Sequence, residues 1–329
     1  MTRAIFHLPA TEHLPPFTGA TQWFNTDPLT PEALRGKVVL VNFWTYTCVN
    51  WLRTLPYVRA WSKKYRAAGL VVLGVHTPEF ALEHDLANVQ QAIQRLQVDY
   101  PVVVDNDYAI WNAFANHYWP ALYFADAQGR IRYNHFGEGE YEMCERVLQQ
   151  LLAEAGAEKV SDSLVDVDLR GTAAPADWTN LGSAETYLGY DRANGFVTPG
   201  GLAVGRSHTY DGEDTPGLNQ WALQGAWTVD NTVAVADEPS ASLSFRFHAR
   251  DLNLVMGPVT HGGSVQFRVR LDGEPPHGAH GEDADAEGNG TATEQRMYQL
   301  IRSQQPIQDR LFQIEFLQPG AQVLVFTFG

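Results

Sequence analysis

The stretch that decides the fold is Val38-Val39-Leu40-Val41-Asn42-Phe43-Trp44-Thr45-Tyr46-Thr47-Cys48-Val49-Asn50-Trp51-Leu52. Its first seven residues are mostly β-branched or apolar, which is typical of a strand buried on both faces of a sheet. From Cys48 to Ala68, large apolar side chains recur at helical spacing, although Pro56 lies inside the run. The stretch therefore predicts a central strand that leads into a helix, with a cysteine at the junction.

The segments that follow continue the alternation of strands and helices. A short apolar run predicts a buried strand, and apolar residues three and four positions apart predict a helix. On these patterns we expect strands at 70–75, 100–104, 120–125 and 130–133, helices at 83–97, 106–117 and 140–154, and a hairpin turn at 126–129. The order β-α-β-α-β-α-β-β-α predicts an α/β domain over residues 1–155.

The second half of the chain has a different periodicity. Small and acidic residues over 156–178 predict a linker. Beyond it, the stretches 242–247, 265–271 and 311–316 alternate apolar with polar residues, and Asp272-Gly273 supplies a turn. We expect residues 179–329 to form an antiparallel β-sandwich. Two domains also suit a chain of 329 residues.

Composition excludes several classes of protein. The chain has 23 basic and 38 acidic residues, a net charge of −15, so it lacks the basic footprint of a nucleic-acid-binding protein. Its two cysteines cannot form a disulfide framework. The first sixteen residues contain three prolines and no apolar run of a secretory signal, and no run is long enough to span a membrane. We expect a soluble, cytoplasmic protein.

Several motifs resemble those of a known superfamily. Residues 42–56, together with Trp119-Pro120, resemble the active-site region of the thioredoxin superfamily. More narrowly, the chain resembles thioredoxin-like redoxins of the AhpC/TSA type, and in particular the soluble C-terminal part of DipZ-type thiol-disulfide proteins. The narrower likeness lies in Gly74-Val75-His76-Thr77-Pro78-Glu79-Phe80, Asp105-Asn106-Asp107-Tyr108, Phe136-Gly137-Glu138-Gly139, Tyr187-Leu188-Gly189-Tyr190, Tyr298-Gln299-Leu300-Ile301-Arg302 and Phe326-Thr327-Phe328-Gly329. It implies a thioredoxin-like fold followed by an all-β jelly-roll sandwich of the carbohydrate-binding kind.

The sequence departs from this family at the redox motif. Redox-active members carry Cys-x-x-Cys, whereas this chain has Cys48-Val49-Asn50-Trp51. Dithiol exchange needs a second thiol that breaks the mixed disulfide, and an indole cannot do this. The usual disulfide cycle within the motif is therefore impossible. Cys144 is expected to be a passive thiol, because the last helix of this fold packs away from the site.

Cys48 still has two one-cysteine reactions open to it. A helix start favours its thiolate, which could attack a disulfide or a peroxide and then await an external thiol. Thr45-x-x-Cys48 resembles the Thr-x-x-Cys of peroxiredoxins, whose hydroxyl helps to hold peroxide, although Thr45 could equally serve the helix start. Alternatively, Cys48 is an inert residue at a packed turn. In that case the protein is a non-catalytic binding protein, which uses the cleft and the sandwich to recognise a ligand or peptide.

Other residues around Cys48 follow from the resemblance. Glu79 comes after the strand at 70–75, where redoxins place a carboxylate beside the cysteine. The resemblance therefore implies a role beside Cys48, and the alternative is a solvated side chain. Trp119-Pro120 matches the cis-proline loop that faces the cysteine. An aromatic wall for an apolar ligand is expected from Trp44, Tyr46, Trp51, Tyr118 and Trp119.

Two groups of residues in the second domain each have two interpretations. Asp283 to Glu294 nearly fits a calcium loop with His277 and His280 beside it, but a solvated acidic loop is the favoured interpretation. Trp221, Trp227, Tyr187 and Tyr190 could stack on a sugar or fill the core. We expect no metal and no cofactor. The expected partners are an external thiol reductant and a disulfide or peroxide substrate, and the oligomeric state is left open.

Overall fold

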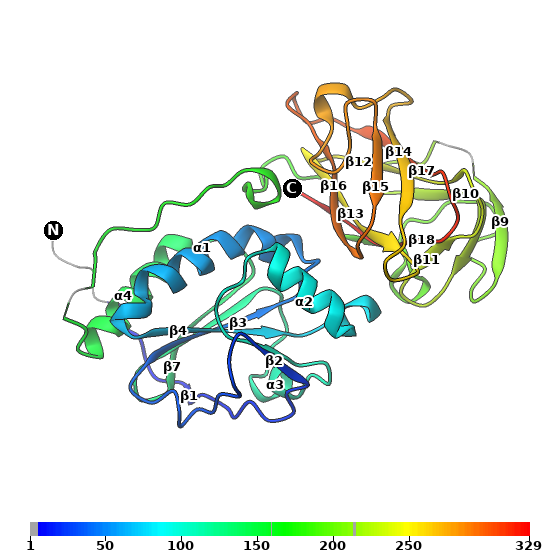
Figure 1. Ribbon diagram of the computed structural model, residues 1–329. Helices are drawn as coiled ribbons and strands as arrows, with labels where there is room; N and C mark the ends of the chain where they lie inside the picture. The colour runs from blue at the N-terminus through cyan, green and yellow to red at the C-terminus, as the bar shows by residue number, and fades with distance from the viewer. Residues whose placement is uncertain (1–5, 159, 213–214) are drawn as a thin grey trace. The chain divides into compact units, whose positions relative to one another are not determined.

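The computed structural model describes residues 6–158, 160–212 and 215–329 and divides into two compact units (Figure 1). The boundary lies between Ala173 and Ala174. Part of the segment expected as a linker packs on the first unit, since the Val165 N–H donates to the Glu145 carboxylate at 2.9 Å. In these described ranges, no helix has both the length and the apolar character needed to cross a membrane.

A seven-stranded sheet forms the centre of the first unit. β3 pairs in parallel with β4 and antiparallel with β6, as expected of a strand with neighbours on both sides. The strand order is β1-β7-β6-β3-β4-β5-β2. The strands are β1 (Glu12–His13), β2 (Gln22–Phe24), β3 (Val38–Trp44), β4 (Leu70–His76), β5 (Val102–Val104), β6 (Ala121–Ala125) and β7 (Arg130–Phe136).

Helices cover both faces of this sheet, and Figure 1 shows α1, α2 and α4 on one face and α3 on the other. Alternation along β3 explains the two layers. Val39, Val41 and Phe43 join the core cluster on the α3 side, whereas Trp44 stacks on Trp51 of α1 with ring centroids 4.3 Å apart. The helices are α1 (Val49–Tyr65), α2 (Leu86–Arg95), α3 (Ala109–Ala113) and α4 (Tyr141–Glu154).

Local capping corrects the ends of two predicted helices. α2 begins at Leu86 rather than Glu83, because the Asp85 side chain accepts from Ala87 N–H at 2.8 Å; Glu83 lies in a short 3-10 turn instead. α3 has only five residues, because Asp105 accepts from the N–H groups of its first turn and the chain leaves the helix by Ala115, where φ is 47°. The other predicted helices and strands of this unit are confirmed within a few residues of their ends.

The second unit is one antiparallel sheet of eleven strands. The three strands predicted from alternation are confirmed as β12, β14 and β17. Asp272 and Gly273 both have positive φ in the tight turn after β14. The strands are β8 (Thr186–Tyr187), β9 (Ser207–Asp211), β10 (Trp221–Val229), β11 (Ala234–Ala236), β12 (Ala241–Phe247), β13 (Asp251–Pro258), β14 (Val265–Leu271), β15 (Asn289–Ala292), β16 (Arg296–Arg302), β17 (Arg310–Phe316) and β18 (Ala321–Phe328).

This sheet curls so that its two halves share one core. The ring centroid of Phe326 in β18 lies 5.0 Å from that of Phe245 in β12 and 5.8 Å from that of Phe312 in β17. Neither β12 nor β17 is a neighbour of β18 in the sheet. The core also takes in Trp221 and Trp227, each 0% exposed. These two indoles therefore fill the core and cannot stack on a sugar.

Candidate active site

Cys48 occupies the N-cap position of the 17-residue helix α1 and is half-buried. The chain reaches it through a turn in which Cys48 N–H donates to the Thr45 carbonyl at 3.3 Å. No acidic residue lies in the first turn of α1. The unpaired N–H groups of a helix start and the helix dipole both favour an anion at this position. The local structure is thus suited to a thiolate.

The loop that faces Cys48 contains a cis peptide bond between Trp119 and Pro120, which confirms the expectation from the resemblance. Cys48 Sγ lies 3.7 Å from the Trp119 carbonyl oxygen and donates to it. The Trp119 indole N–H in turn donates to the carbonyl of Thr77, just after β4, at 3.1 Å. Trp119 therefore links the loop that carries Cys48, after β3, to the loop after β4.

The expected aromatic wall lies largely inside the domain. Trp44 and Trp51 are 0% exposed and Tyr46 is 1% exposed, so these three side chains are core residues and do not line an open cleft. Gly74 permits this packing, because a Cβ there would lie 2.9 Å from the Trp44 indole nitrogen. Contact with a ligand at the surface would fall to half-buried Trp119 and to Tyr118, which is 51% exposed.

Glu83 is the carboxylate that the structure buries against the cysteine loop. Its Oε1 accepts from the Thr47 hydroxyl at 2.5 Å, and its Oε2 accepts from the N–H groups of Glu79 and Phe80 at 2.6 and 3.0 Å. Glu79 follows β4 as expected and is half-buried, and its assigned role stays a prediction. A glutamate three residues after Phe80, as in a capping box, was the signal that could have identified Glu83.

The Thr45 hydroxyl is also directed into the domain. Thr45 is 0% exposed, and its Oγ1 forms no hydrogen bond within the described residues. It nevertheless lies close enough to Glu83 to help lower the pKa of that carboxyl group. The hydroxyl is thus placed beside Glu83 rather than on an open surface.

Burial raises the pKa of Glu83 to about 6 from its ordinary value of 4.5, while the nearby Thr45 hydroxyl and the hydrogen bonds from Thr47 and Phe80 oppose this shift. Between pH 4.5 and 6, the Glu83 carboxyl group is therefore mostly protonated in the folded state and mostly ionised in the unfolded state. Glu83 favours folding most below pH 4.5, and about 2 kcal/mol of stability is lost as the pH rises from below 4.5 through 6. Glu83→Gln keeps hydrogen-bonding atoms in place and is expected to remove this loss. Urea denaturation of the wild type and of Glu83→Gln from pH 4.5 to 7 measures the free energy of unfolding. If this free energy changes equally with pH in both proteins, the raised pKa does not belong to Glu83.

His76 does not supply a positive charge to the site. Its ring lies against Trp44, at 4.9 Å between centroids, and stacks on Tyr46 at 5.8 Å. Neither ring nitrogen has a hydrogen-bond partner within the described residues, and burial lowers the pKa of His76 to about 3. The imidazole is therefore neutral at physiological pH and belongs to the core beneath the cysteine.

A buried ion pair anchors α1 on its other side. Arg53 Nη1 lies 2.9 Å from Glu138 Oε1, and the two side chains are 3% and 9% exposed. Burial raises the pKa of Glu138, and Arg53 opposes that shift. Glu138 lies in the loop between β7 and α4, so the pair holds this loop to the helix that begins after Cys48. No spacing in the sequence indicated this pair.

Cys144 lies in a different environment from Cys48. It lies in α4, is 0% exposed, and burial raises the pKa of its thiol to about 12. A thiol in this state is a poor nucleophile, because the thiolate is the reactive form.

The candidate calcium loop uses its carboxylates within the protein. Asp283 accepts from Arg296 at 2.6 Å and from Gln299 N–H at 2.7 Å, and Asp285 accepts from Asn289 N–H at 2.7 Å. Across the part of the chain that the structure describes, no three His, Cys, Asp or Glu side chains are grouped to hold a metal ion.

The fold and the geometry around Cys48 define a thioredoxin-like redoxin domain, in which a helix-capping cysteine faces a cis-proline loop. Comparison with known families agrees. Residues 10–134 match the AhpC/TSA family, and residues 183–329 match the family described as the thioredoxin like C-terminal domain. The chain therefore joins a domain of the AhpC/TSA type to a second domain of the thioredoxin like C-terminal type.

Several proteins are similar to this chain. It is 35% identical over 269 residues to Protein DipZ of Mycobacterium bovis and of Mycobacterium tuberculosis, which covers 79% of this chain but 36% of the length of each relative. It is 29% identical to the thiol-disulfide oxidoreductase YkuV of Bacillus subtilis, over 43% of this chain and 95% of that protein. The solution structure of a thioredoxin-like protein in the oxidized form is 31% identical, with a TM-score of 0.41 over 44% of this chain and 96% of that one.

Proposed function

We propose that this protein is a thiol-disulfide oxidoreductase that works with Cys48 alone. The observation that carries the proposal is the position of the sulfur, at the N-terminus of α1 and 3.7 Å from the carbonyl of Trp119 in the cis-proline loop. A helix start activates a thiolate, and a backbone group beside it can pair with an extended substrate. Similarity to the thiol-disulfide oxidoreductase YkuV and the match to the AhpC/TSA family support the same chemistry.

The reaction proceeds in two exchanges. The Cys48 thiolate attacks one sulfur of a substrate disulfide, so that a Cys48–substrate disulfide forms, the substrate S–S bond breaks and the other sulfur leaves as a thiolate. An external thiol, deprotonated, then attacks the sulfur of the bound substrate. This step forms a disulfide between the external thiol and the substrate and releases the Cys48 thiolate.

Disulfide exchange suits the site better than peroxide reduction. A peroxidase of the Thr-x-x-Cys kind needs its threonine hydroxyl against the peroxide, but the Thr45 hydroxyl is buried beside Glu83.

The reducing thiol that a lone cysteine requires is abundant in the cytoplasm, which is the compartment we propose. For the second unit we propose a jelly-roll arrangement, supported by its antiparallel pairing and shared core.

The rate of alkylation of Cys48 as a function of pH tests this proposal. Iodoacetamide should modify Cys48 with a midpoint below about 8.5, the value of an unperturbed cysteine, because the helix start stabilises the thiolate. Cys144 serves as the internal control and should remain unmodified in the folded protein. A midpoint at or above 8.5 would favour the alternative, a binding protein in which the cleft recognises a peptide without chemistry.

A further inference from the structure

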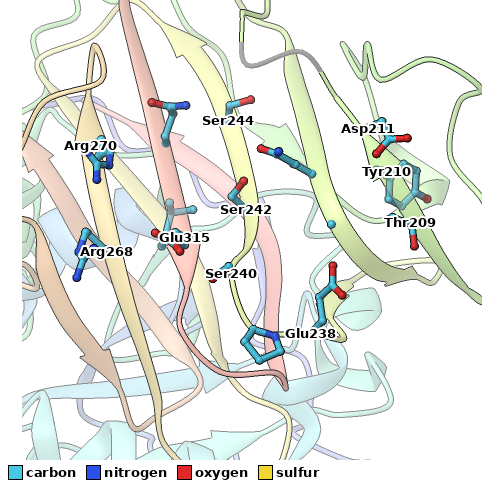
Figure 2. Close-up of a pocket in the computed structure, with 15 residues that line it drawn as sticks. Thr209, Tyr210, Asp211, Glu238, Ser240, Ser242, Ser244, Arg268, Arg270 and Glu315 are labelled. Carbon is cyan, nitrogen blue, oxygen red and sulfur yellow. The ribbon is translucent and has the colours of Figure 1, made fainter.

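A polar groove crosses one face of the second unit. It has a volume of about 440 Å³ and is formed by β14, β17, β12, β10 and β9, with the loop before β12 at its edge. The strand alternation explains its chemistry. Phe267, Val269 and Leu271 of β14 are buried in the core, so Arg268 and Arg270, which alternate with them, face outward. Figure 2 shows both arginines at one side of the groove, across from Ser242 and Ser244.

The strand register places polar side chains in a row across the five strands. Arg268 is opposite Glu315, Glu315 is opposite Ser242, Ser242 is opposite Gln224, and Gln224 is opposite Asp211. At about 4.8 Å between strands, this row spans roughly 19 Å. An extended peptide covers that distance with five or six residues.

The two ends of the row carry opposite charge. Arg268 and Arg270 lie at the β14 end, and Asp211 and Glu238 lie at the β9 end (Figure 2). Gly225 leaves room for the second of these carboxylates, because a Cβ there would lie 2.9 Å from Glu238 Oε1. Between the two ends, Glu315 lies next to Arg268, and the other residues are neutral and offer hydrogen-bonding groups, from Ser242, Ser244, Gln313 and Gln224.

The arginines retain donors for a ligand. Arg268 Nε donates to Asn289 at 3.3 Å and Arg270 Nη1 donates to the Gly273 carbonyl at 3.1 Å, which uses one of the five N–H groups of each guanidinium. Within the described residues, no ion pair within 4 Å joins Arg268 to the neighbouring Glu315. A pair of arginines with available donors stands out in a chain of net charge −15.

We propose that this groove binds an extended, polar peptide segment of a partner protein. An acidic side chain or a carboxyl terminus of the peptide contacts Arg268 and Arg270, and a basic side chain contacts Asp211 and Glu238. The charge at both ends favours a peptide over a neutral glycan, which would leave these groups without a partner. The one aromatic residue in the lining, Tyr210, is 1% exposed and gives a sugar ring no platform. This binding is independent of the chemistry of Cys48.

Selection from a phage-displayed library of random hexapeptides tests the proposal. The bait is the full chain with Cys48→Ser, which prevents capture through a disulfide. We expect the enriched peptides to carry Asp or Glu toward one end and Lys or Arg toward the other. Synthetic versions of these peptides should bind at least about tenfold more weakly to R268E/R270E and lose affinity as the salt concentration rises.

Two further arms make the result decisive. Arg206→Glu is the matched control, because Arg206 is an exposed arginine of the same unit outside the groove lining, and it should leave binding unchanged. A peptide with its acidic residue changed to lysine should regain affinity for R268E/R270E. The proposal is overturned if no charge pattern is enriched, if the peptides bind R268E/R270E equally well, or if tetragalacturonate binds in the groove while the peptides do not.

Discussion

Cys48→Ser is expected to abolish disulfide exchange. The substitution keeps the size of the side chain and its place at the start of α1 but removes the sulfur that would form the mixed disulfide. The rate of reduction of 2-hydroxyethyl disulfide by glutathione should fall by at least about a hundredfold, to the rate without protein. The wild-type chain should also form a disulfide between Cys48 and 2-mercaptoethanol, the mixed disulfide of the first exchange, which mass spectrometry of peptic fragments detects.

Cys144→Ser is the matched control for this experiment. Cys144 is buried in α4 with a pKa of about 12, so its removal should leave the exchange rate unchanged. If Cys48→Ser retains the wild-type rate, or if Cys144→Ser loses it, the assignment of the nucleophile is wrong. A wild-type chain that never exceeds the rate without protein would instead support the non-catalytic alternative.

Trp51→Ala is expected to destabilise the first unit by about 3–5 kcal/mol. Trp51 stands where the second cysteine of the family motif would be, yet its indole is 0% exposed and stacks on Trp44 at 4.3 Å. Truncation therefore leaves a large cavity beneath the start of α1. Trp51→Phe should cost less, because it keeps a ring on Trp44 and removes an indole N–H that has no partner within the described residues.

The thiol of Cys144 gives a probe of this stability that is specific to the first unit. In a Cys48→Ser background, a short pulse of alkylating agent at increasing urea concentrations labels Cys144 only when its surroundings unfold. The labelling midpoint should move to lower urea for Trp51→Ala. Tyr118→Ala is the matched aromatic control, because Tyr118 is 51% exposed, and its midpoint should change little. Equal midpoints for both variants would show that Trp51 does not support the core.

Most elements of the first unit, and three of the eleven strands described in the second, followed from the sequence because their periodicity is strong. The apolar run of β3 and the alternation of β14 each fix which residues face a core. The ends of α2 and α3 did not follow, because single side-chain caps from Asp85 and Asp105 decide them. Such a cap contributes only about 1 kcal/mol and leaves a weak signal in sequence.

The candidate site followed from the sequence only in part. The resemblance located Cys48 and the cis bond before Pro120, and the structure agrees with both positions. The direction of Trp51 could not be predicted, since the first turn of a helix can present an aromatic ring to the core or to solvent. The burial of Glu83 was not predicted either, because glutamate side chains are usually exposed to solvent. Here, hydrogen bonds from the Thr47 hydroxyl and two backbone N–H groups compensate for the burial.

The indole at position 51 also determines what an oxidised form of this protein can be. A dithiol protein stores two electrons internally and therefore has a midpoint potential of its own. Here, with Cys144 enclosed in α4, any disulfide at Cys48 includes a second molecule. The oxidised species is thus an adduct, and its potential belongs to that pair and changes with each thiol to which Cys48 is joined.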